Sequence, residues 1–236
     1  MSELTRDGLE RLAAIGTATL SMQLVKRGIR RHLIAGARPL MPGQRIAGPA
    51  FTLRFMPGRE DVATPESYTA AGGLPEAVEA VPEGAVVVME SHGVLSSGLL
   101  GDILCDRLRI RGARGAVTDG AMRDMPGLRR VGWPVWCGGL TPPPSIGDLY
   151  FAGWGMPVGC GGTAVFPGDI VVADEDGAIV VPAGLAAAVL DGAVAQDAFE
   201  QWVIAEVAGG RPVTGLYPPT PAAAEEYERH RQKLRG

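Results

Sequence analysis

The stretch GLLGDILCDRLRIRGARGAVTDGAMRD, residues 98–124, decides the fold. It begins with a glycine-flanked acidic turn, and apolar residues at helical spacing follow over 103–111. Residues 116–118 then form a short apolar run, as do residues 85–89 just before the turn, and both are typical of buried strands. This order places the acidic turn and the closing Arg-Asp pair at one edge of a sheet, where open α/β proteins tend to bind ligands. The stretch therefore predicts an α/β fold with a site at that edge.

Other segments predict the remaining elements of the same domain. Pro167-Gly168-Asp169 and Asp174-Glu175-Asp176-Gly177 are strong turn signals that separate three short apolar strands. The expected helices cover residues 5–12, 17–28 or 19–28, 65–81 and 184–207. The expected strands cover residues 45–55, 85–89, 116–118, 132–139, 163–166, 170–173 and 178–181. We expect a single domain over residues 1–221 and a charged C-terminal tail over residues 222–236.

Composition limits the classes of protein to which the chain can belong. A chain of 236 residues with 46% hydrophobic content can bury a substantial core. A net charge of −4 and only 6% aromatic residues disfavour a nucleic-acid groove, which needs a basic stripe and stacking rings. The N-terminus has no apolar run long enough for a signal peptide or a membrane span, so we expect a cytoplasmic protein without membrane contact.

Several common site motifs are missing from the sequence. The three cysteines are an odd number without CxxC or Cys-His spacing, which argues against a disulfide framework or a zinc site. Neither a GxxxxGK[ST] phosphate loop nor a GxGxxG dinucleotide motif occurs, and Ser96 and Ser97 lack a nucleophile-elbow context. His92 follows a strand and is more typical of a satisfied loop residue than of a catalyst.

The acidic turn is open to two interpretations. Gly98 and Gly101 allow a close approach of the backbone to a ligand, and a turn that opens a helix presents free N–H groups to a carboxylate or phosphate. The alternative is a tight strand-to-helix turn in which Asp102 only caps the helix. The GxxGD pattern alone does not decide between them.

The Arg-Asp pair also has two interpretations. In a loop, Arg123 and Asp124 can both turn toward one ligand. Asp124 with waters and substrate oxygens is an adequate site for Mg²⁺ or Mn²⁺, and Arg123 would hold a substrate oxygen and stabilise charge that develops on it. The alternative is a solvated ion pair on the surface.

The combination of these motifs resembles a known family. The chain is similar to the RraA-like regulators of ribonuclease activity and to the class II 4-hydroxy-4-methyl-2-oxoglutarate / 4-carboxy-4-hydroxy-2-oxoadipate aldolases, over about residues 10–205. The motifs that carry this resemblance are Gly98-Leu99-Leu100-Gly101-Asp102, Val117-Thr118-Asp119-Gly120 with Arg123-Asp124, Val165-Phe166-Pro167-Gly168-Asp169 and Ala173-Asp174-Glu175-Asp176-Gly177-Ala178.

The resemblance implies both a fold and a reaction. The fold is an α/β sandwich like the phosphohistidine swivelling domain, assembled into trimers or hexamers with active sites between subunits. The reaction is divalent-metal-dependent cleavage of a 2-oxo acid to pyruvate, and often decarboxylation of oxaloacetate. By this resemblance Asp124 binds the metal, and Arg123 contacts the 2-oxo group and the leaving portion of the substrate. Asp102 positions the metal-bound water that exchanges protons. Amides around Gly101, Asp102 and Ile103 would hold the pyruvate carboxylate, and Gly98 is a further expected substrate-binding residue of the same turn.

Three functions remain to be compared. The first is the metal-dependent lyase. Its cleavage step leaves a pyruvate enolate with negative charge on oxygen, which a metal ion and Arg123 can both stabilise. The only lysines, Lys26 and Lys233, lie outside the motif region, which disfavours a Schiff-base route. The second is a non-catalytic regulator that binds a ribonuclease. The third is a quinone methyltransferase, which is disfavoured because this chain has no glycine-rich nucleotide loop. The aldolases also use a carboxylate from a neighbouring subunit, for which Glu200 and Glu206 are candidates.

Overall fold

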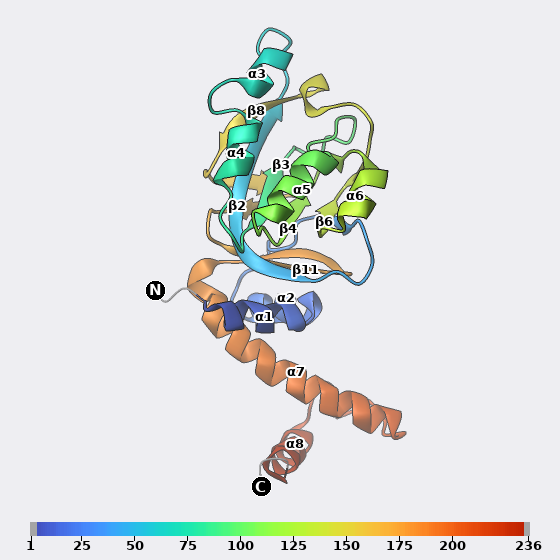
Figure 1. Cartoon of the computed structure of the whole chain (residues 1–236). Helices are drawn as coiled ribbons and strands as arrows, with labels where there is room; N and C mark the ends of the chain where they lie inside the picture. Colours follow the sequence, from blue (N-terminus) through green and yellow to red (C-terminus); the bar gives the residue numbers. More distant parts are fainter. Residues whose placement is uncertain (1–3, 234–236) are drawn as a thin grey trace. The chain divides into compact units, whose positions relative to one another are not determined.

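A computed structural model describes residues 4–233 of the chain (Figure 1). Contacts within the chain divide it into two compact units, Met1–Leu190 and Asp191–Gly236. The first unit contains all the motifs described above, and each unit is considered by itself.

An eight-stranded mixed sheet forms the centre of the first unit. Its central strands β2, β3, β4 and β6 run parallel. β1, β8 and β11 pair antiparallel with this group, and β12 pairs antiparallel with β11. The order across the sheet is β1 (Arg38–Pro39), β6 (Val135–Cys137), β4 (Gly115–Thr118), β3 (Val86–Glu90), β2 (Ile46–Pro57), β11 (Ile170–Asp174) and β12 (Gly177–Val181), with β8 (Leu149–Trp154) also paired to β2. Every residue of β3 and β4 is buried, and all but the last residue of each strand, Glu90 and Thr118, lack a polar side chain, which is typical of strands covered on both faces.

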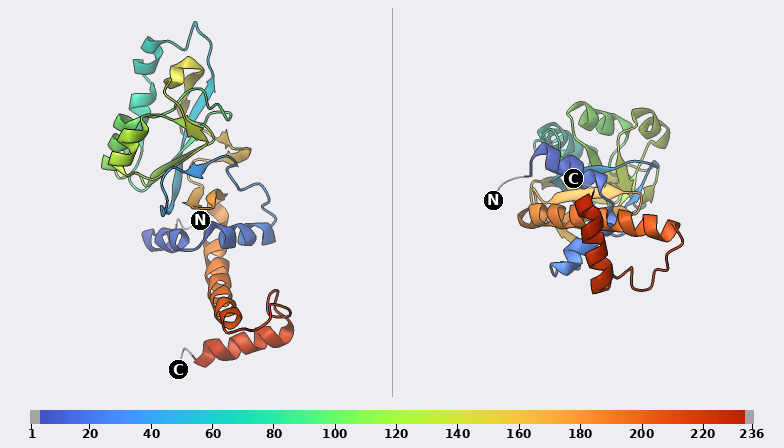
Figure 2. Two further views of the ribbon diagram at one scale, coloured as in Figure 1. Left: turned by 90° about the vertical axis from the view of Figure 1, so that its right-hand side faces the viewer. Right: turned by 90° about the horizontal axis from the view of Figure 1, so that it is seen from below.

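Helices and short strands cover the two faces of this sheet. On one face lie α4 (Leu74–Ala80), α5 (Asp102–Ile110) and α6 (Met125–Val131), as Figures 1 and 2 show. Their apolar side chains and those of β2 and β3 form one core cluster, which includes Leu53, Met89 and Leu108. The second cluster, around Trp136, packs against the hairpin of β9 (Val158–Cys160) and β10 (Thr163–Val165). The helices α1 (Arg6–Ala14) and α2 (Thr17–Lys26) pack against β2, β11 and β12. The predicted α/β fold is confirmed.

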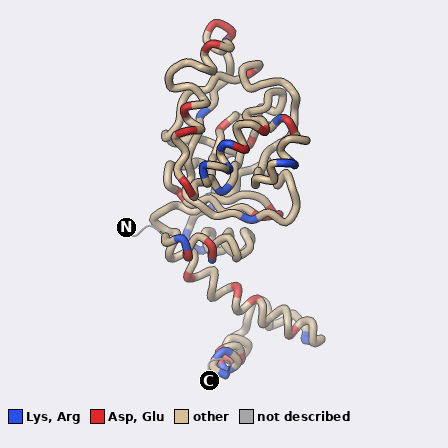
Figure 3. Tube along the Cα trace, in the orientation of Figure 1, with Lys and Arg blue, Asp and Glu red and all other residues tan. Residues whose placement is uncertain are grey.

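The charged residues of α5 are paired with neighbours of opposite sign. Arg107 donates to Glu79 with 2.7 Å between Nε and Oε1, and Arg109 lies 2.9 Å from the carboxylate of Asp106. Figure 3 shows basic and acidic positions interspersed in this part of the first unit. The basic end of α5 is therefore part of a mixed surface.

The expected single helix over residues 65–81 is wrong, because two helices occupy this segment. The first, α3 (Pro65–Thr69), ends before Gly72, which has a φ of 77°, and α4 begins after Gly73. A Cβ on Gly73 would lie 2.6 Å from the backbone oxygen of Tyr68, so the two glycines allow a sharp corner that a continuous helix would not form. This corner directs α3 toward the pocket described below.

The expected strand over residues 132–139 is also shorter than predicted. Of these residues, only β6 (Val135–Cys137) is a strand of the main sheet. Residues 139–140 form β7 (Gly139–Leu140), which pairs with β5 (Ala121–Met122). The preceding residues form α6, which the sequence analysis did not predict because Pro126 and Gly127 interrupt its apolar pattern. Pro126 is in the first turn of α6, where a missing N–H costs nothing.

The second unit consists mainly of helix. It contains most of α7 (Ala186–Ala208) and all of α8 (Pro221–Lys233). Phe199, Trp202 and Tyr227 form an aromatic cluster between these helices, and Arg211 binds Glu226 with 2.7 Å between Nη2 and Oε2. Over residues 4–233, none of the helices is both long and apolar enough to cross a membrane.

Candidate active site

The two turns of the motif region are joined by backbone hydrogen bonds. Leu99 N donates to Ala121 O at 2.9 Å, and Arg123 N donates to Leu100 O at 3.1 Å. Gly98 also forms an isolated parallel bridge with Ala121. The acidic turn and the Arg-Asp pair therefore lie side by side at the carboxyl edge of β3 and β4, as the sequence predicted.

Gly98 and Gly101 are required by the chain itself. A Cβ on Gly98 would lie 2.8 Å from Cβ of Arg123, and a Cβ on Gly101 would overlap with Oδ2 of Asp124. Real Cβ atoms do not approach other atoms so closely. The two glycines thus allow the Arg-Asp loop to pack directly on the turn, a role that the sequence analysis did not foresee.

Asp124 adopts a left-handed backbone conformation, with φ 62° and ψ 43°, immediately before α6. Aspartate tolerates this region better than most residues other than glycine. The Asp124 side chain is 41% exposed, and Nε of Arg123 donates to its Oδ2 at 3.2 Å. The carboxylate therefore keeps contact with solvent beside a guanidinium group.

Asp102 has a different environment from the one expected of a helix cap. The N-cap of α5 is Gly101, and no side chain makes a capping hydrogen bond there. Asp102 instead accepts a 3.0 Å hydrogen bond from Nη2 of Arg130 on α6, and a Cβ on Gly127 would overlap with its carboxylate. The helix-cap alternative for Asp102 is therefore wrong. Arg130 was not predicted as a partner of Asp102, because the helix α6 that carries it was itself not predicted.

The first turn of α5 faces the same region with its backbone N–H groups. The first helical hydrogen bond is donated by Cys105 N to Gly101 O at 3.1 Å. The amides of Asp102, Ile103 and Leu104 precede it, so they have no acceptor within the helix. Together with the positive end of the helix dipole, they can hold a carboxylate.

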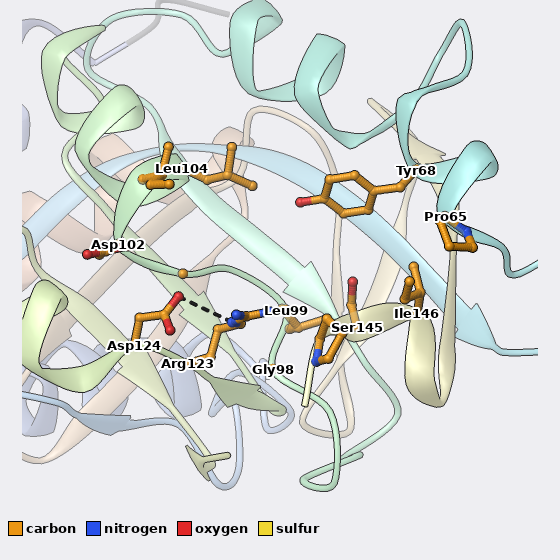
Figure 4. Close-up of a pocket in the computed structure, with 13 residues that line it drawn as sticks. Pro65, Tyr68, Gly98, Leu99, Asp102, Leu104, Arg123, Asp124, Ser145 and Ile146 are labelled. Carbon is orange, nitrogen blue, oxygen red and sulfur yellow. Dashed lines mark hydrogen bonds and ion pairs between the residues drawn. The ribbon is translucent and has the colours of Figure 1, made fainter. Parts of the chain in front are cut away.

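These groups line one pocket of about 340 Å³ (Figure 4). It contains all six residues that the sequence analysis selected: Gly98, Gly101, Asp102, Ile103, Arg123 and Asp124. It also contains seven that were not selected as site residues: Pro65, Tyr68, Leu99, Leu104, Pro144, Ser145 and Ile146. Most of these seven come from α3 and from residues 144–146, which only the tertiary fold brings to the turns.

Tyr68 is the most notable of the additional residues. Its ring extends from α3 over the pocket, with the hydroxyl end toward Leu104 (Figure 4). Burial raises the pKa of the Tyr68 phenol, and the positive charge of Arg123 opposes this shift. The phenol is therefore neutral and able to donate a hydrogen bond near pH 7.

Asp148 anchors the wall formed by residues 144–146. Its Oδ2 accepts hydrogen bonds from Ser96 Oγ at 2.6 Å and from Ser97 Oγ at 2.5 Å. These bonds lower the pKa of the Asp148 carboxyl group. Ser96 and Ser97 thus position a pocket wall through Asp148.

The remaining candidates have other partners. His92 does not line the pocket, and its loop is held by Asp119, whose carboxylate accepts from the amides of Ser91 and Gly93. In the second unit, Glu200 accepts a 3.0 Å bond from the hydroxyl of Tyr217, and Glu206 pairs with Arg211 at 3.1 Å. That Glu200 or Glu206 contributes a carboxylate to the site of a neighbouring subunit stays a prediction.

The donor set of the pocket fits one hard cation. Within residues 4–233, no group of three or more His, Cys, Asp or Glu side chains converges as a metal cage. Mg²⁺ and Mn²⁺ do not need such a cage, because they retain several waters and accept substrate oxygens. The half-exposed Asp124 carboxylate offers an oxygen ligand with solvent beside it, so it could hold such an ion.

Comparisons with known proteins define the class. The model of the RraA-like family, described as Aldolase/RraA, matches residues 17–180, and the chain belongs to this family. The chain is 29% identical over 188 residues to a protein of Halalkalibacterium halodurans named "Putative 4-hydroxy-4-methyl-2-oxoglutarate aldolase", and the match covers 78% of this chain and 80% of that protein.

Two further relatives have other names. Protein DlpA of Legionella pneumophila is 30% identical over 174 residues, a match that covers 74% of this chain but only 27% of DlpA. The solved structure of Streptomyces coelicolor RraAS2, described as an unusual member of the RNase ES inhibitor RraA protein family, is 36% identical with a TM-score of 0.77. That likeness covers 86% of this chain and 98% of RraAS2. The family thus includes proteins named as enzymes and proteins named as inhibitors.

Proposed function

We propose that this chain is a divalent-metal-dependent lyase that cleaves a 4-hydroxy-2-oxo acid to pyruvate, and that it also decarboxylates oxaloacetate. One observation carries the proposal: a helix N-terminus, Arg123 and Asp124 meet in one pocket of about 340 Å³. The helix N-terminus can hold an anion, the Arg123 guanidinium group can donate to substrate oxygens, and the Asp124 carboxylate can bind a hard metal ion. If Arg123 and Asp124 formed only a solvated ion pair on the surface, they would not need the pocket around them.

The retro-aldol step requires stabilisation of one developing charge. The C3–C4 bond breaks, the C4 hydroxyl group loses its proton to become a carbonyl, and the electron pair passes to C3 and the C2 oxygen. Arg123 can donate to the C2 oxygen as this charge grows, which lowers the barrier more than it stabilises the substrate. Protonation at C3 then gives pyruvate.

The other residues hold the substrate and the proton. We assign the C1 carboxylate to the first-turn amides of α5, which precede the first helical bond at Cys105. Asp102 is held by Arg130 at 3.0 Å, and we assign it the positioning of the water that exchanges protons with the substrate. Asp124 would hold Mg²⁺ or Mn²⁺, which supplies Lewis-acid stabilisation of oxygen charge when bound.

We further propose that the active chain is a homotrimer or homohexamer with its sites at subunit interfaces. Support comes from family membership and from the 41% exposure of the Asp124 side chain, which leaves one side of it open. A neighbouring carboxylate, with Glu200 and Glu206 as candidates, would then complete the site. Light scattering of the purified chain measures the number of subunits directly.

The test is an assay of pyruvate release by the purified full-length protein from 4-hydroxy-2-oxo acids and from oxaloacetate. Activity should disappear with EDTA, return with added Mg²⁺ or Mn²⁺, and be absent from Asp124→Asn. Release that survives EDTA and that substitution would defeat the metal-dependent mechanism. Failure of every substrate in the presence of Mg²⁺ and Mn²⁺ would defeat the lyase assignment itself.

A second candidate function is regulation of a ribonuclease by protein binding. The observation that favours it is the 36% identity to RraAS2, which is described within an RNase ES inhibitor family. Inhibition of a ribonuclease by direct binding should be unchanged in Asp124→Asn, because binding by a surface does not require a metal ligand. The same variant therefore separates the two functions.

A further inference from the structure

The side chain of Asp102 lies against α6 at two positions that are one helical turn apart. Gly127 and Arg130 are separated by three residues along this helix, so they lie on the same face of it. A Cβ on Gly127 would overlap with the Asp102 carboxylate, and Nη2 of Arg130 donates to Oδ2 of that carboxylate at 3.0 Å. We refer to these two positions as the Asp102-binding face of α6.

The stability of α6 does not explain why residue 127 is a glycine. Gly127 is buried within the helix, where glycine is a poorer helix former than alanine. Its φ is not positive, so its backbone conformation is open to other residues. The contact with Asp102 does require glycine, because any side chain at this position would take the space of the carboxylate.

The ion pair of Arg130 and Asp102 is also not explained by stability. The side chain of Arg130 is 75% exposed, whereas that of Asp102 is 23% exposed. An ion pair with so exposed a partner contributes little to the free energy of unfolding. The pair does restrict the rotation of the Asp102 side chain, because both contacts with α6 involve Oδ2. Oδ1 is then the oxygen that can accept a hydrogen bond from a water.

The same helix positions Asp124. Asp124 is the N-cap residue of α6, and Leu128 N donates to Asp124 O at 2.9 Å. Both Asp102 and Asp124 line the pocket. One short helix therefore fixes two carboxylates of the proposed site, one at its first turn and one on its side. Proton transfer depends on such fixed geometry, because the groups that exchange the proton must stay within hydrogen-bond reach.

We propose that Arg130 is a positioning residue for proton transfer, and that it acts through Asp102 together with Gly127. This assignment rests on the proposed lyase function, in which Asp102 positions the water that exchanges protons with the substrate. Loss of Arg130 should slow proton transfer at C3 of the substrate. It should leave substrate binding unchanged, because the first-turn amides of α5 and Arg123 hold the carboxylate and the 2-oxo group.

Exchange of the methyl protons of pyruvate isolates the proton-transfer step. A C3–H bond of pyruvate breaks, its proton passes to water, and the enolate takes a deuteron from D₂O at the same carbon. With the full-length protein and Mg²⁺, proton NMR in D₂O gives the kcat and KM of exchange, and isothermal titration calorimetry gives the Kd of pyruvate. We expect kcat to fall by about tenfold in Arg130→Met, a part of the roughly 100-fold loss that a displacement of about 1 Å can cause. KM and Kd should stay at their wild-type values.

Three further variants test whether the effect is specific. Arg130→Lys keeps a positive charge and should recover part of the exchange rate. Arg109→Met removes an exposed ion pair of the same kind, in which Arg109 lies 2.9 Å from the carboxylate of Asp106 on α5, outside the pocket lining. This control should exchange at the wild-type rate. Gly127→Ala places a methyl group against the Asp102 carboxylate and should slow exchange as Arg130→Met does, with thermal melts to verify that it folds.

The outcomes separate this inference from the function on which it rests. Wild-type exchange in Arg130→Met, or an equal loss in Arg109→Met, would overturn the positioning role and leave the lyase intact. A weaker Kd for pyruvate that accounts for the whole loss would also overturn it, because Arg130 would then act on binding. Wild-type exchange in a folded Gly127→Ala would overturn the role of Gly127. A wild-type protein that neither cleaves any substrate nor exchanges pyruvate protons would overturn the lyase function together with this inference.

Discussion

Asp124 lies directly against Gly101, so closely that a Cβ on Gly101 would overlap with Oδ2 of the Asp124 carboxylate. This contact joins the N-terminus of α5 to the loop that carries the Arg-Asp pair. Its geometry depends on two backbone features, the missing side chain at position 101 and the left-handed conformation of Asp124 with φ 62°. Each feature gives a separate prediction.

Gly101→Ala should displace the Asp124 carboxylate. Overpacking of this kind destabilises proteins by about 1–3 kcal/mol, and a displacement of about 1 Å at a reacting centre can reduce turnover by about 100-fold. Pyruvate release and the denaturant midpoint measure the two effects. Gly139→Ala is the control, because its Cβ would meet only Leu95 at 3.7 Å, an ordinary contact. Equal activity of the two variants would contradict the role of this contact.

Substitutions of Asp124 should separate stability from activity. Asn tolerates left-handed backbone, whereas Ala in that region costs roughly 1 kcal/mol or more. We therefore expect Asp124→Asn to melt close to wild type and Asp124→Ala to melt a few degrees lower, with both inactive in pyruvate release. Thermal melts without added metal measure the first difference. If Asp124→Ala were as stable as Asp124→Asn, the backbone conformation would impose no strain at this position.

The sequence predicted that the residues of the two turns lie together, because the information there is local. Gly98, Gly101 and Asp102 belong to one turn, and Arg123 and Asp124 follow the next strand, so the order of elements suffices to bring them together. All of them line the pocket. The strands β3 and β4 were predicted within a residue or two because both are continuous apolar runs.

The part of the pocket lining that comes from α3 and from residues 144–146 could not be predicted in the same way. Tyr68 reaches the pocket only because Gly72 and Gly73 break the expected helix over residues 65–81, and that break depends on contacts with the backbone of Tyr68. Ile146 lies in the 3-10 helix η1 (Ser145–Gly147), which Asp148 fixes through two serine hydroxyl groups. Long-range contacts of this kind leave no periodic signal in the sequence.

Arg123→Lys should lose most of the activity. A guanidinium group can contact Asp124 and a substrate oxygen at the same time through its fork, but an ammonium group on a shorter reach cannot reproduce both contacts. We expect kcat/KM to fall by about 100-fold, the size of loss seen when one donor to a developing oxyanion is removed. Arg59→Lys is the control, because Arg59 pairs with Asp61 on the surface, with side chains 73% and 64% exposed. Similar losses in both variants would argue against a specific role of Arg123.

The three buried cysteines should make the protein less stable at high pH. Burial raises the pKa of the thiols of Cys105, Cys137 and Cys160 above the ordinary value, and the charge of Asp102 adds to this effect at Cys105. An unfolded thiol ionises near pH 8.5, whereas the folded thiol stays protonated, so above that pH the unfolded state binds fewer protons. The free energy of unfolding must then fall as the pH rises.

Urea unfolding at intervals between about pH 7.5 and 10.5 measures this dependence, with the ordinary thiol pKa as the expected onset. Cys105→Ala is the matched variant: it leaves a small cavity at every pH but removes one raised thiol. Its free energy of unfolding should therefore decline less steeply, and the difference from wild type should shrink as the pH rises. A difference that stays constant or grows across this range would show that Cys105 does not resist ionisation in the folded protein.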